Sequence, residues 1–382
     1  MIEYKNTDLA AYKNVWVFCE QREGKLMPTD FELISEGRRL ADELGVKLVG
    51  LLLGGEGVAE LAPELGGYGA DEIIVCEDPK LGIYTTGGYT KVICDAIEHF
   101  KPEAVLIGAT NIGRDLGPRC AARLHTGLCA DCTHLDIDMG IYEDFLKANS
   151  TLPADRIDTL INKHSVKVLG EDHDTSRDLK MTRPAFGGHL MATIICPRFR
   201  PAMATVRPGV LKKAPFDQAK ADAVKITKFD VEIGEGDIIT EVVEIKKAAK
   251  KLVDLVGADY VVSVGRGISK DVEEGIRLGQ ELADELGGVL GGSRVAIDSG
   301  WLTADHQVGQ TGKTVHPKVY IALGISGSIQ HKAGMQESEC IVAINKNESA
   351  PIFEIADYGI TGDLFKVTPL LIQSIREAKA AK

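Results

Sequence analysis

The stretch YIALGISGSIQHKAG, residues 320–334, decides the fold of the second half of this chain. Its first four residues form an apolar run without alternation, as expected of a strand that is buried on both faces. Gly324 and Gly327 then allow a tight turn and a close approach of the backbone to a ligand. Ser326 and Ser328 supply hydroxyl groups that can cap a following helix. The order of these residues predicts a strand, a glycine turn and a helix.

The helix start predicted after this turn favours the binding of a phosphate, because free backbone N–H groups and a partial positive charge meet there. The letters Gly324-Ile-Ser326-Gly-Ser328 also come close to the G-x-S-x-G signature of a hydrolase nucleophile. The last position is a serine, however, and no histidine follows His331 to act as the base in the expected order. We therefore interpret the segment as a phosphate-binding turn and not as a serine hydrolase site.

Several blocks around this turn, in the correct order, resemble the FAD-binding domain of the electron-transfer flavoprotein alpha subunit. The match extends from about Leu290 to Pro369. It includes GGSR (291–294), QVGQTGK (307–313), the quoted turn, IVAIN (341–345) and PIFEIADYGITGDLF (351–365). Collinear blocks are more specific than a single glycine motif. The resemblance implies FAD as the cofactor, bound by a doubly wound domain.

The resemblance also implies roles for individual residues. Arg294 corresponds to a cation beside the flavin that balances negative charge, Thr311 to a hydroxyl group on N5, and His331 to a donor or positive charge at the C2 carbonyl. The implied set is completed by Ser293, Gln307, Gln310, Gly312, Gly324, Ser326, Gly327, Ser328 and Gln330, and by Asn345 and Asp363 at the ribose and adenine end. Four alternatives stay open: a surface Arg294, a turn residue Thr311, a His331 bonded to a backbone carbonyl, and a helix N-cap at Asp363.

The first half of the chain alternates apolar strands with helices, which is typical of a parallel sheet covered on both faces. Strands are predicted at 15–18, 48–53, 72–76, 104–108, 190–196 and 202–206, and helices at 30–44 and 91–100. Residues 139–182 are polar and weakly periodic, and we interpret them as an insertion. The predicted fold class is α/β with two domains, each a mainly parallel sheet flanked by helices. We expect a first domain at 1–210 that faces a beta subunit, a linker at 211–247 and an FAD-binding domain at 248–382.

Arginines recur at helical spacing after the predicted strand at 104–108. Arg114, Arg119 and Arg123 form either a solvated basic face or an anion or partner site near the end of that strand. A second basic region comprises Arg183, Arg198, Arg200 and Arg207. Our first interpretation of that region is an ion-pair surface between domains or subunits, and the second is an anion site.

Composition excludes some classes of protein. A net charge of −12 argues against nucleic-acid binding, which needs a basic surface. The apolar runs are too short for membrane insertion, and the N-terminus lacks the pattern of a signal or transit peptide. We therefore expect a cytoplasmic protein.

The eight cysteines are scattered, as in a protein with reduced thiols. Cys129 and Cys132 form the one C-x-x-C pair in the chain, with His125 and His134 nearby. Buried thiols, a redox dithiol and a metal site are the three interpretations of this pair, and no metal is predicted because a second ligand pair is missing.

The resemblance implies a function in electron transfer and assigns no catalytic residue to the chain. The protein would be the alpha subunit of a heterodimer with an electron-transfer flavoprotein beta subunit. It would pass single electrons between dehydrogenases and acceptors, with an acyl-CoA dehydrogenase or a similar flavin dehydrogenase as a partner. The blocks TGLCADCT (126–133), RPAFGG (183–188) and MATVRPG (203–209) are similar to the bifurcating branch of the family. In that branch NADH reduces a second flavin, and electrons pass to ferredoxin or flavodoxin and through the alpha FAD. The alternatives are a non-bifurcating carrier, a nucleotide-binding module without redox function, and an NAD-dependent deacylase-like enzyme.

Overall fold

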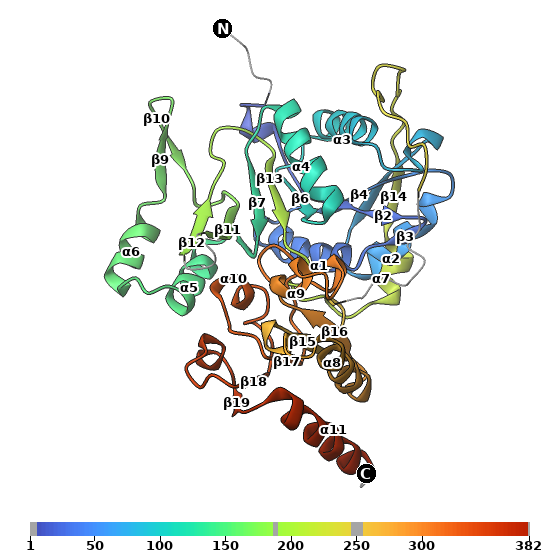
Figure 1. Ribbon diagram of the computed structural model, residues 1–382. Coiled ribbons are helices and arrows are strands. Elements are labelled where there is room, and N and C mark those ends of the chain that lie inside the picture. Colours follow the sequence, from blue (N-terminus) through green and yellow to red (C-terminus); the bar gives the residue numbers. More distant parts are fainter. Residues whose placement is uncertain (1–5, 186–189, 246–254, 381–382) are drawn as a thin grey trace. The chain divides into compact units, whose positions relative to one another are not determined.

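The computed structural model describes residues 6–185, 190–245 and 255–380, and these residues fall into two units (Figure 1). The first unit contains residues 6–185 and 190–245, and the second contains 255–380. Each unit is built on a parallel sheet with helices against it, so the predicted α/β class is confirmed. Within these ranges, no helix combines the length and the apolar character needed to cross a membrane.

Seven parallel strands form the sheet of the first unit in the order β14-β5-β4-β1-β6-β13-β7. Their bounds are Val15–Cys19 (β1), Leu48–Gly54 (β4), Glu72–Glu77 (β5), Ala104–Gly108 (β6), Leu128–Cys132 (β7), Ala202–Val206 (β13) and Lys225–Lys228 (β14). Every residue of the three central strands β4, β1 and β6 is buried. This double burial explains why the sequence shows continuous apolar runs and not an alternation.

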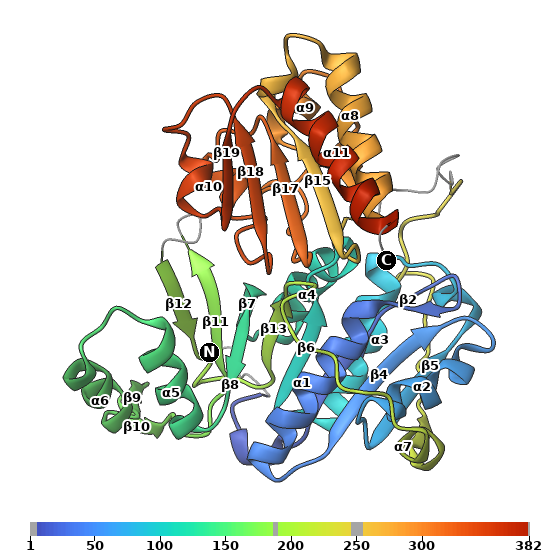
Figure 2. The same cartoon turned by 90° about the horizontal axis from the view of Figure 1, so that it is seen from below.

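Helices cover both faces of this sheet (Figure 2). On one face lie α1 (Pro28–Leu44) and α2 (Ala62–Gly67), and on the other lie α3 (Thr86–Phe100) and α4 (Asn111–Leu124). Alternate residues of β1 divide between the two layers, since Val17 packs with the first and Trp16 with the second. The helix predicted at 91–100 begins five residues earlier, at Thr86. Its first turn contains Gly87, where a Cβ would lie 2.4 Å from the Asp237 carbonyl oxygen, so the close packing there requires glycine.

The segment interpreted as an insertion is folded. It contains α5 (Met139–Asn149), α6 (Ala154–Asn162) and the antiparallel hairpin β9 (Ser165–Val168) and β10 (Glu171–Asp174). Beside it, β8 (His134–Asp136), β11 (Lys180–Ala185) and β12 (Leu190–Ile194) form a three-stranded antiparallel sheet. A short hairpin, β2 (Gln21–Arg22) and β3 (Lys25–Leu26), follows β1.

The described part of the expected linker, residues 211–245, lies in the first unit. It supplies α7 (Gln218–Ala223) and the edge strand β14, which pairs in parallel with β5 from Lys225 with Glu72 to Lys228 with Val75. The first unit therefore extends beyond residue 210, where its end was expected. The FAD-binding domain was expected to start at residue 248, and the first residues of that range, 248–254, lie outside the described residues.

The second unit contains five parallel strands in the order β16-β15-β17-β18-β19. Their bounds are Tyr260–Val264 (β15), Val289–Gly292 (β16), Val319–Leu323 (β17), Ile341–Asn345 (β18) and Tyr358–Thr361 (β19). Two long helices, α8 (Val272–Leu286) and α11 (Leu364–Ala380), pack on one face. The other face is covered by residues outside the long helices, such as Val308, Val315 and Ile352. Two short helices, α9 (Arg294–Asp298) and α10 (Ile329–Lys332), follow the strands β16 and β17 in the chain.

Candidate cofactor site

The carboxyl ends of the five strands in the second unit bring many of the predicted site residues to one edge of the sheet. The chain passes from β15 outward to β16 and then returns to β17 on the other side of β15, so the strand order reverses there. Ligands of open α/β sheets bind at such a switch point. The predicted residues at these strand ends are Ser293 and Arg294 after β16, Gly324, Ser326, Gly327 and Ser328 after β17, Asn345 in β18, and Asp363 after β19.

The two turn glycines are required by the packing of the unit itself. Gly324 and Gly327 have φ values of 64° and 82°, which favour glycine. A Cβ on Gly324 would lie 2.7 Å from the Gly267 Cα, and one on Gly327 would lie 2.3 Å from the Ile352 backbone nitrogen. Backbone hydrogen bonds hold the turn on both sides, from Gly267 N to Gly324 O (2.9 Å) and from Ile352 N to Ser326 O (3.1 Å). The turn is therefore fixed between two neighbouring loops.

The helix after the turn is a single turn, because α10 has only four residues. The backbone N–H groups of His331 and Lys332 both donate to the Ser328 carbonyl, and the Ser328 side chain makes no capping hydrogen bond. The expectation that serine hydroxyl groups cap this helix is therefore wrong. Ser326 and Ser328 are exposed, and their hydroxyl groups have no hydrogen-bond partner in the described part of the chain.

The turn fits the diphosphate of FAD. Two exposed serine hydroxyl groups lie on a rigid backbone loop at the switch point, together with the backbone N–H groups of residues 326–328. Within the described residues, those N–H groups donate no hydrogen bond to the protein. Free donors on a fixed loop are what an oxyanion needs, and they would take the place here of the dipole of a long helix.

A second loop, residues 307–313, contacts both the end of β16 and α10. Gln307 forms a parallel bridge with Gly292, and the Gln310 backbone N–H donates to the Gln330 carbonyl at 2.7 Å. Inside the loop, the Gln307 side-chain amide donates to the Thr311 hydroxyl group at 2.9 Å. The loop thus brings Gln307, Gln310, Thr311 and Gly312 beside the glycine turn.

Arg294 lies at the start of α9, and its side chain is 67% exposed. It pairs with Asp298 one helical turn later at 3.2 Å, and Asp298 is equally exposed. An exposed pair of this kind contributes little to stability. The guanidinium group can therefore leave Asp298 for an anionic ligand at small cost.

His331 is buried, and its Nε2 atom lies 2.9 Å from the Tyr320 hydroxyl oxygen. Its Nδ1 atom has no partner with hydrogen-bond geometry among the described residues. Burial lowers the pKa of His331 to about 4, and the nearby Val308 backbone offsets a part of this effect. The ring is therefore neutral at pH 7, so the structure favours the donor role over the positive charge.

Asn345 closes the loops at the end of β18. Its amide nitrogen donates to the Ile325 carbonyl at 2.8 Å, and its amide oxygen accepts from the Asn347 backbone N–H at 3.0 Å. Both hydrogen bonds are made to backbone groups of the protein, so they stabilise the loops next to β18. Contact with the ribose remains a prediction for this side chain.

Asp363 precedes α11 and accepts a hydrogen bond from the Phe365 backbone N–H at 3.1 Å. The helix N-cap, one of the alternatives left open, is therefore present. Lys346 pairs with the other carboxylate oxygen at 3.0 Å and holds the pKa of Asp363 below its usual range. Its role toward the adenine end of FAD remains a prediction.

Tyr320 is the residue of this site that sequence reasoning missed. It is fully buried, and burial holds the pKa of its hydroxyl group above the ordinary value. The signal in the sequence was one polar atom inside the apolar strand β17. Such an atom needs a partner when buried, and here the partner is His331.

The C-x-x-C pair lies in β7, the last strand of the seven-stranded sheet, and both cysteines are buried. The Cys132 thiol donates to the Cys129 carbonyl at 3.5 Å, and the Cys129 thiol donates to the Met181 carbonyl at 3.8 Å. Both are free thiols. These contacts favour the interpretation of buried thiols. In the described part of the chain, no cluster of metal-binding side chains is present.

Several of the arginines singled out from the sequence form ion pairs inside the first unit. Arg114 and Arg207 both bind Asp131, at 2.9 Å and 2.6 Å. Arg200 is buried between Asp178 and Glu103. Arg200 and Arg207 were expected to form ion pairs between domains or subunits. In the structure, both form ion pairs with carboxylates of their own unit.

Most of the chain matches known protein families. Residues 15–170 and 154–233 match the family model of the electron transfer flavoprotein domain, and residues 254–336 match that of the electron transfer flavoprotein FAD-binding domain. The acryloyl-CoA reductase electron transfer subunit beta of Anaerotignum propionicum is 64% identical over 99% of this chain and 100% of its own length. The electron transfer flavoprotein subunit alpha of Thermoanaerobacterium thermosaccharolyticum is 51% identical over 96% of this chain and 99% of its own length.

Protein FixB of Clostridium saccharobutylicum is 48% identical over 98% of this chain and 100% of its own length. Among solved structures, a thiamine diphosphate-dependent 4-hydroxybenzoylformate decarboxylase of Rhodococcus jostii matches with a TM-score of 0.19 and 10% identity. The alignment covers 96% of this chain and 60% of that one. A score at that level does not indicate a shared fold.

Proposed function

This chain belongs to the electron transfer flavoprotein alpha-subunit family, and we propose that, paired with a beta subunit, it transfers single electrons between dehydrogenases and acceptors. We propose that it does so in flavin-based electron bifurcation, from NADH to ferredoxin or flavodoxin and to an acyl-CoA dehydrogenase or a similar flavin dehydrogenase. The match of residues 254–336 to the FAD-binding domain supports electron transfer as the function, and FAD is the cofactor of this family. When bound, FAD supplies the redox chemistry, because its ring accepts and releases electrons one at a time. The protein binds and orients the cofactor and tunes its potential.

The residues of the second unit divide this task. We assign the diphosphate to the glycine turn, where Ser326 and Ser328 offer hydroxyl groups without protein partners. We assign the ring to the 307–312 loop and to His331, with Thr311 as a hydrogen-bond donor. Arg294 is the movable cation that balances negative charge on the reduced ring, because only an exposed carboxylate holds it now.

The name of one relative supports the choice of partner. The protein from Anaerotignum propionicum is called an electron transfer subunit of acryloyl-CoA reductase, which points to an enzyme acting on acyl-CoA thioesters. The sequence blocks at 126–133, 183–188 and 203–209 support the bifurcating branch, with NADH as the donor and ferredoxin or flavodoxin as one acceptor. A non-bifurcating carrier for acyl-CoA dehydrogenases is the alternative.

The test is anaerobic, stepwise reduction of the purified heterodimer, followed by visible spectroscopy. Two FAD molecules per heterodimer, reduction by NADH, and coupled reduction of ferredoxin or flavodoxin would support the full proposal. One flavin that ignores NADH but is reduced by an acyl-CoA dehydrogenase would leave the non-bifurcating carrier. A protein that binds only nucleotide and carries no flavin would overturn the assignment.

The role of Arg294 can be tested in the same preparation. We expect Arg294→Gln to retain FAD but to shift its midpoint potential to a more negative value, because the reduced ring loses a nearby positive charge. Arg277→Gln removes an arginine from α8, where it pairs with Glu274 and Glu281, and serves as the matched control. Equal potentials in both variants would contradict the assignment.

A further inference from the structure

A cavity of about 440 Å³ lies in the first unit between α3, α4 and residues 236–239. Arg119 and Arg123 of α4 line it, with Thr90 of α3 and Ile239 opposite. It lies among the helices of one face of the sheet and shares no residue with the predicted FAD-binding set. Its volume falls in the usual range of small-molecule sites.

The two arginines of this cavity are unpaired. They are four residues apart, so they lie on the same side of α4, and both are exposed. Across the residues that the structure describes, neither guanidinium group makes an ion pair or hydrogen bond, whereas Arg114 in the same helix is paired with Asp131. Five strong donors on each group are therefore available to a ligand.

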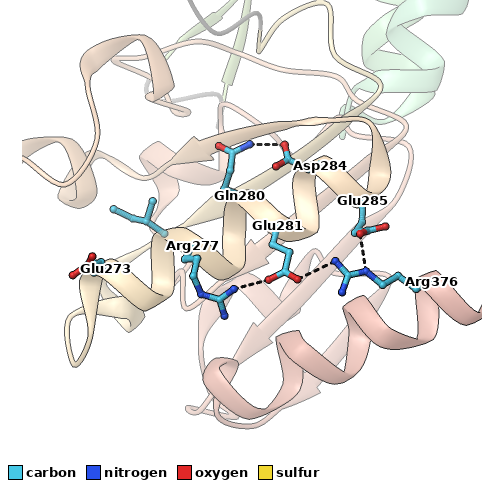
Figure 3. A pocket seen from close by; sticks show the side chains of 8 residues that line it. Glu273, Arg277, Gln280, Glu281, Asp284, Glu285 and Arg376 are labelled. Atoms are coloured by element: carbon cyan, nitrogen blue, oxygen red, sulfur yellow. Dashed lines mark hydrogen bonds and ion pairs between the residues drawn. The ribbon is translucent and has the colours of Figure 1, made fainter.

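A larger concave surface in the second unit also contains two arginines, but these are paired with carboxylates. It measures about 700 Å³ and is lined by α8 and α11 (Figure 3). Its arginines, Arg277 and Arg376, are bound by Glu281, and Arg376 also by Glu285. Charge on that surface is satisfied within the protein. An excess of unpaired cations distinguishes the cavity in the first unit.

The start of α3 adds polar groups without partners. Thr90 is 3% exposed, and its hydroxyl oxygen has no hydrogen-bond partner in the described residues. The hydroxyl group of Thr85 is likewise buried without a partner, although Thr85 occupies the N-cap position of the helix. A buried hydroxyl group without a partner is costly, so the Thr90 hydroxyl in the lining of this cavity requires an explanation.

Two carboxylates lie close to the arginines, and both are already bound by the protein. Asp237 lines the cavity, and one of its oxygens accepts from the Gly234 backbone N–H at 2.9 Å. Asp115 precedes Arg119 by one helical turn and accepts hydrogen bonds from Tyr84 and Thr86. Asp115 does not line the cavity, so the lining itself holds two guanidinium groups and the one carboxylate of Asp237, which gives it a net positive charge.

We propose that this cavity binds the phosphate group of a small phosphorylated metabolite. Arg119 and Arg123 would form bidentate bonds to the phosphate oxygens, which match the planar fork of a guanidinium group. Thr90 would add a hydroxyl donor, and Ile239 would contact the rest of the molecule. The proposal is independent of the function proposed above, since it concerns the first unit alone.

The test is calorimetric titration of the FAD-loaded heterodimer with inorganic phosphate and with glycerol 3-phosphate. We expect saturable binding of both at millimolar concentrations or below, and a tighter fit of the phosphate ester because it fills more of the cavity. Arg119→Gln and Arg123→Gln should each weaken binding about tenfold or more. Arg156→Gln, at an exposed site on α6, is the matched control and should bind as the wild type does. Absence of binding, or binding that is equal in all variants, would overturn the proposal.

Thr90→Val provides a second test that does not depend on charge. The substitution keeps the shape of the side chain and removes a hydroxyl group without a partner, so the variant should fold at least as stably as the wild type. Phosphate should then raise the melting temperature of the wild type more than that of Thr90→Val. An identical increase in melting temperature in both proteins would contradict the role given to Thr90. If phosphate raised the melting temperature of neither protein, the proposal would be overturned.

Discussion

Replacing Gly327 with alanine should disable the cofactor turn, and the structure provides a matched control. Gly327 and Gly287 both have positive φ values, 82° and 69°. A Cβ on Gly327 would lie 2.3 Å from the Ile352 nitrogen and 2.5 Å from its Cα, whereas a Cβ on Gly287 would meet nothing within 4 Å. Gly287→Ala thus tests the backbone conformation alone, and Gly327→Ala tests conformation and collision together.

The expected magnitudes follow from these contacts. A left-handed conformation costs a non-glycine residue about 1–2 kcal/mol, so Gly287→Ala should lower the free energy of unfolding by that amount. Gly327→Ala adds a forced displacement of the Ile352 backbone, which resembles overpacking and costs roughly 1–3 kcal/mol more. The sum is about 2–5 kcal/mol. Since Ile352 N also holds the turn through Ser326 O, the displacement should loosen the predicted phosphate contacts.

The assay is denaturant unfolding of the heterodimer, with flavin fluorescence as the signal for loss of the cofactor. Gly327→Ala should purify with less FAD and release it at a clearly lower denaturant concentration than Gly287→Ala. Equal midpoints for the two variants would refute the reasoning. Full FAD occupancy in Gly327→Ala, with an unchanged midpoint, would refute the assignment of the turn to the cofactor.

Three further predictions concern buried polar groups. Folding lowers the pKa of His331 to about 4 from an ordinary 6.5, so below pH 6.5 the unfolded chain binds a proton that the folded chain does not. The free energy of unfolding should therefore fall by about 3 kcal/mol as the pH drops from 6.5 to 4. Urea titrations at several pH values should show a weaker dependence of this free energy on pH for His331→Gln. Tyr320→Phe leaves the buried Nε2 atom of His331 without its partner and should cost about 1–3 kcal/mol in the same titration at pH 7, and an unchanged midpoint would contradict this. Arg200→Met leaves Asp178 buried without its cation and should cost about 3–5 kcal/mol, measured by unfolding of the first unit, whereas the exposed Arg277→Met should change little.

The strands and the glycine turn could be predicted because local sequence determines them. The apolar runs at 48–53 and 104–108 appear as β4 and β6, and Gly45 ends α1 in the left-handed conformation. The collection of site residues at strand ends also follows from a parallel sheet, whose carboxyl ends share one edge. These features depend on neighbours in sequence.

Features that depend on distant neighbours could not be predicted. The Tyr320–His331 pair, the buried position of Arg200 and the loop bonds of Asn345 come from contacts that the sequence does not order. The short length of α10 has the same origin, since backbone packing at 309 and 334 closes the chain after one turn. The edge strand β14 lies within the range 211–247 that the sequence predicts as a linker, because its mixed charge is typical of an exposed segment. β14 is at the sheet edge, and three of its four residues are exposed.

The position of β14 has a consequence for the synthesis of the protein. Its partner β5 is complete at residue 77, but Lys225 pairs with Glu72 across 153 residues of chain. At typical rates of translation this interval lasts about 8–30 s, during which the outer edge of β5 has no strand beside it. An open edge can pair with the wrong chain, so β5 is exposed to mispairing until residue 228 has been made.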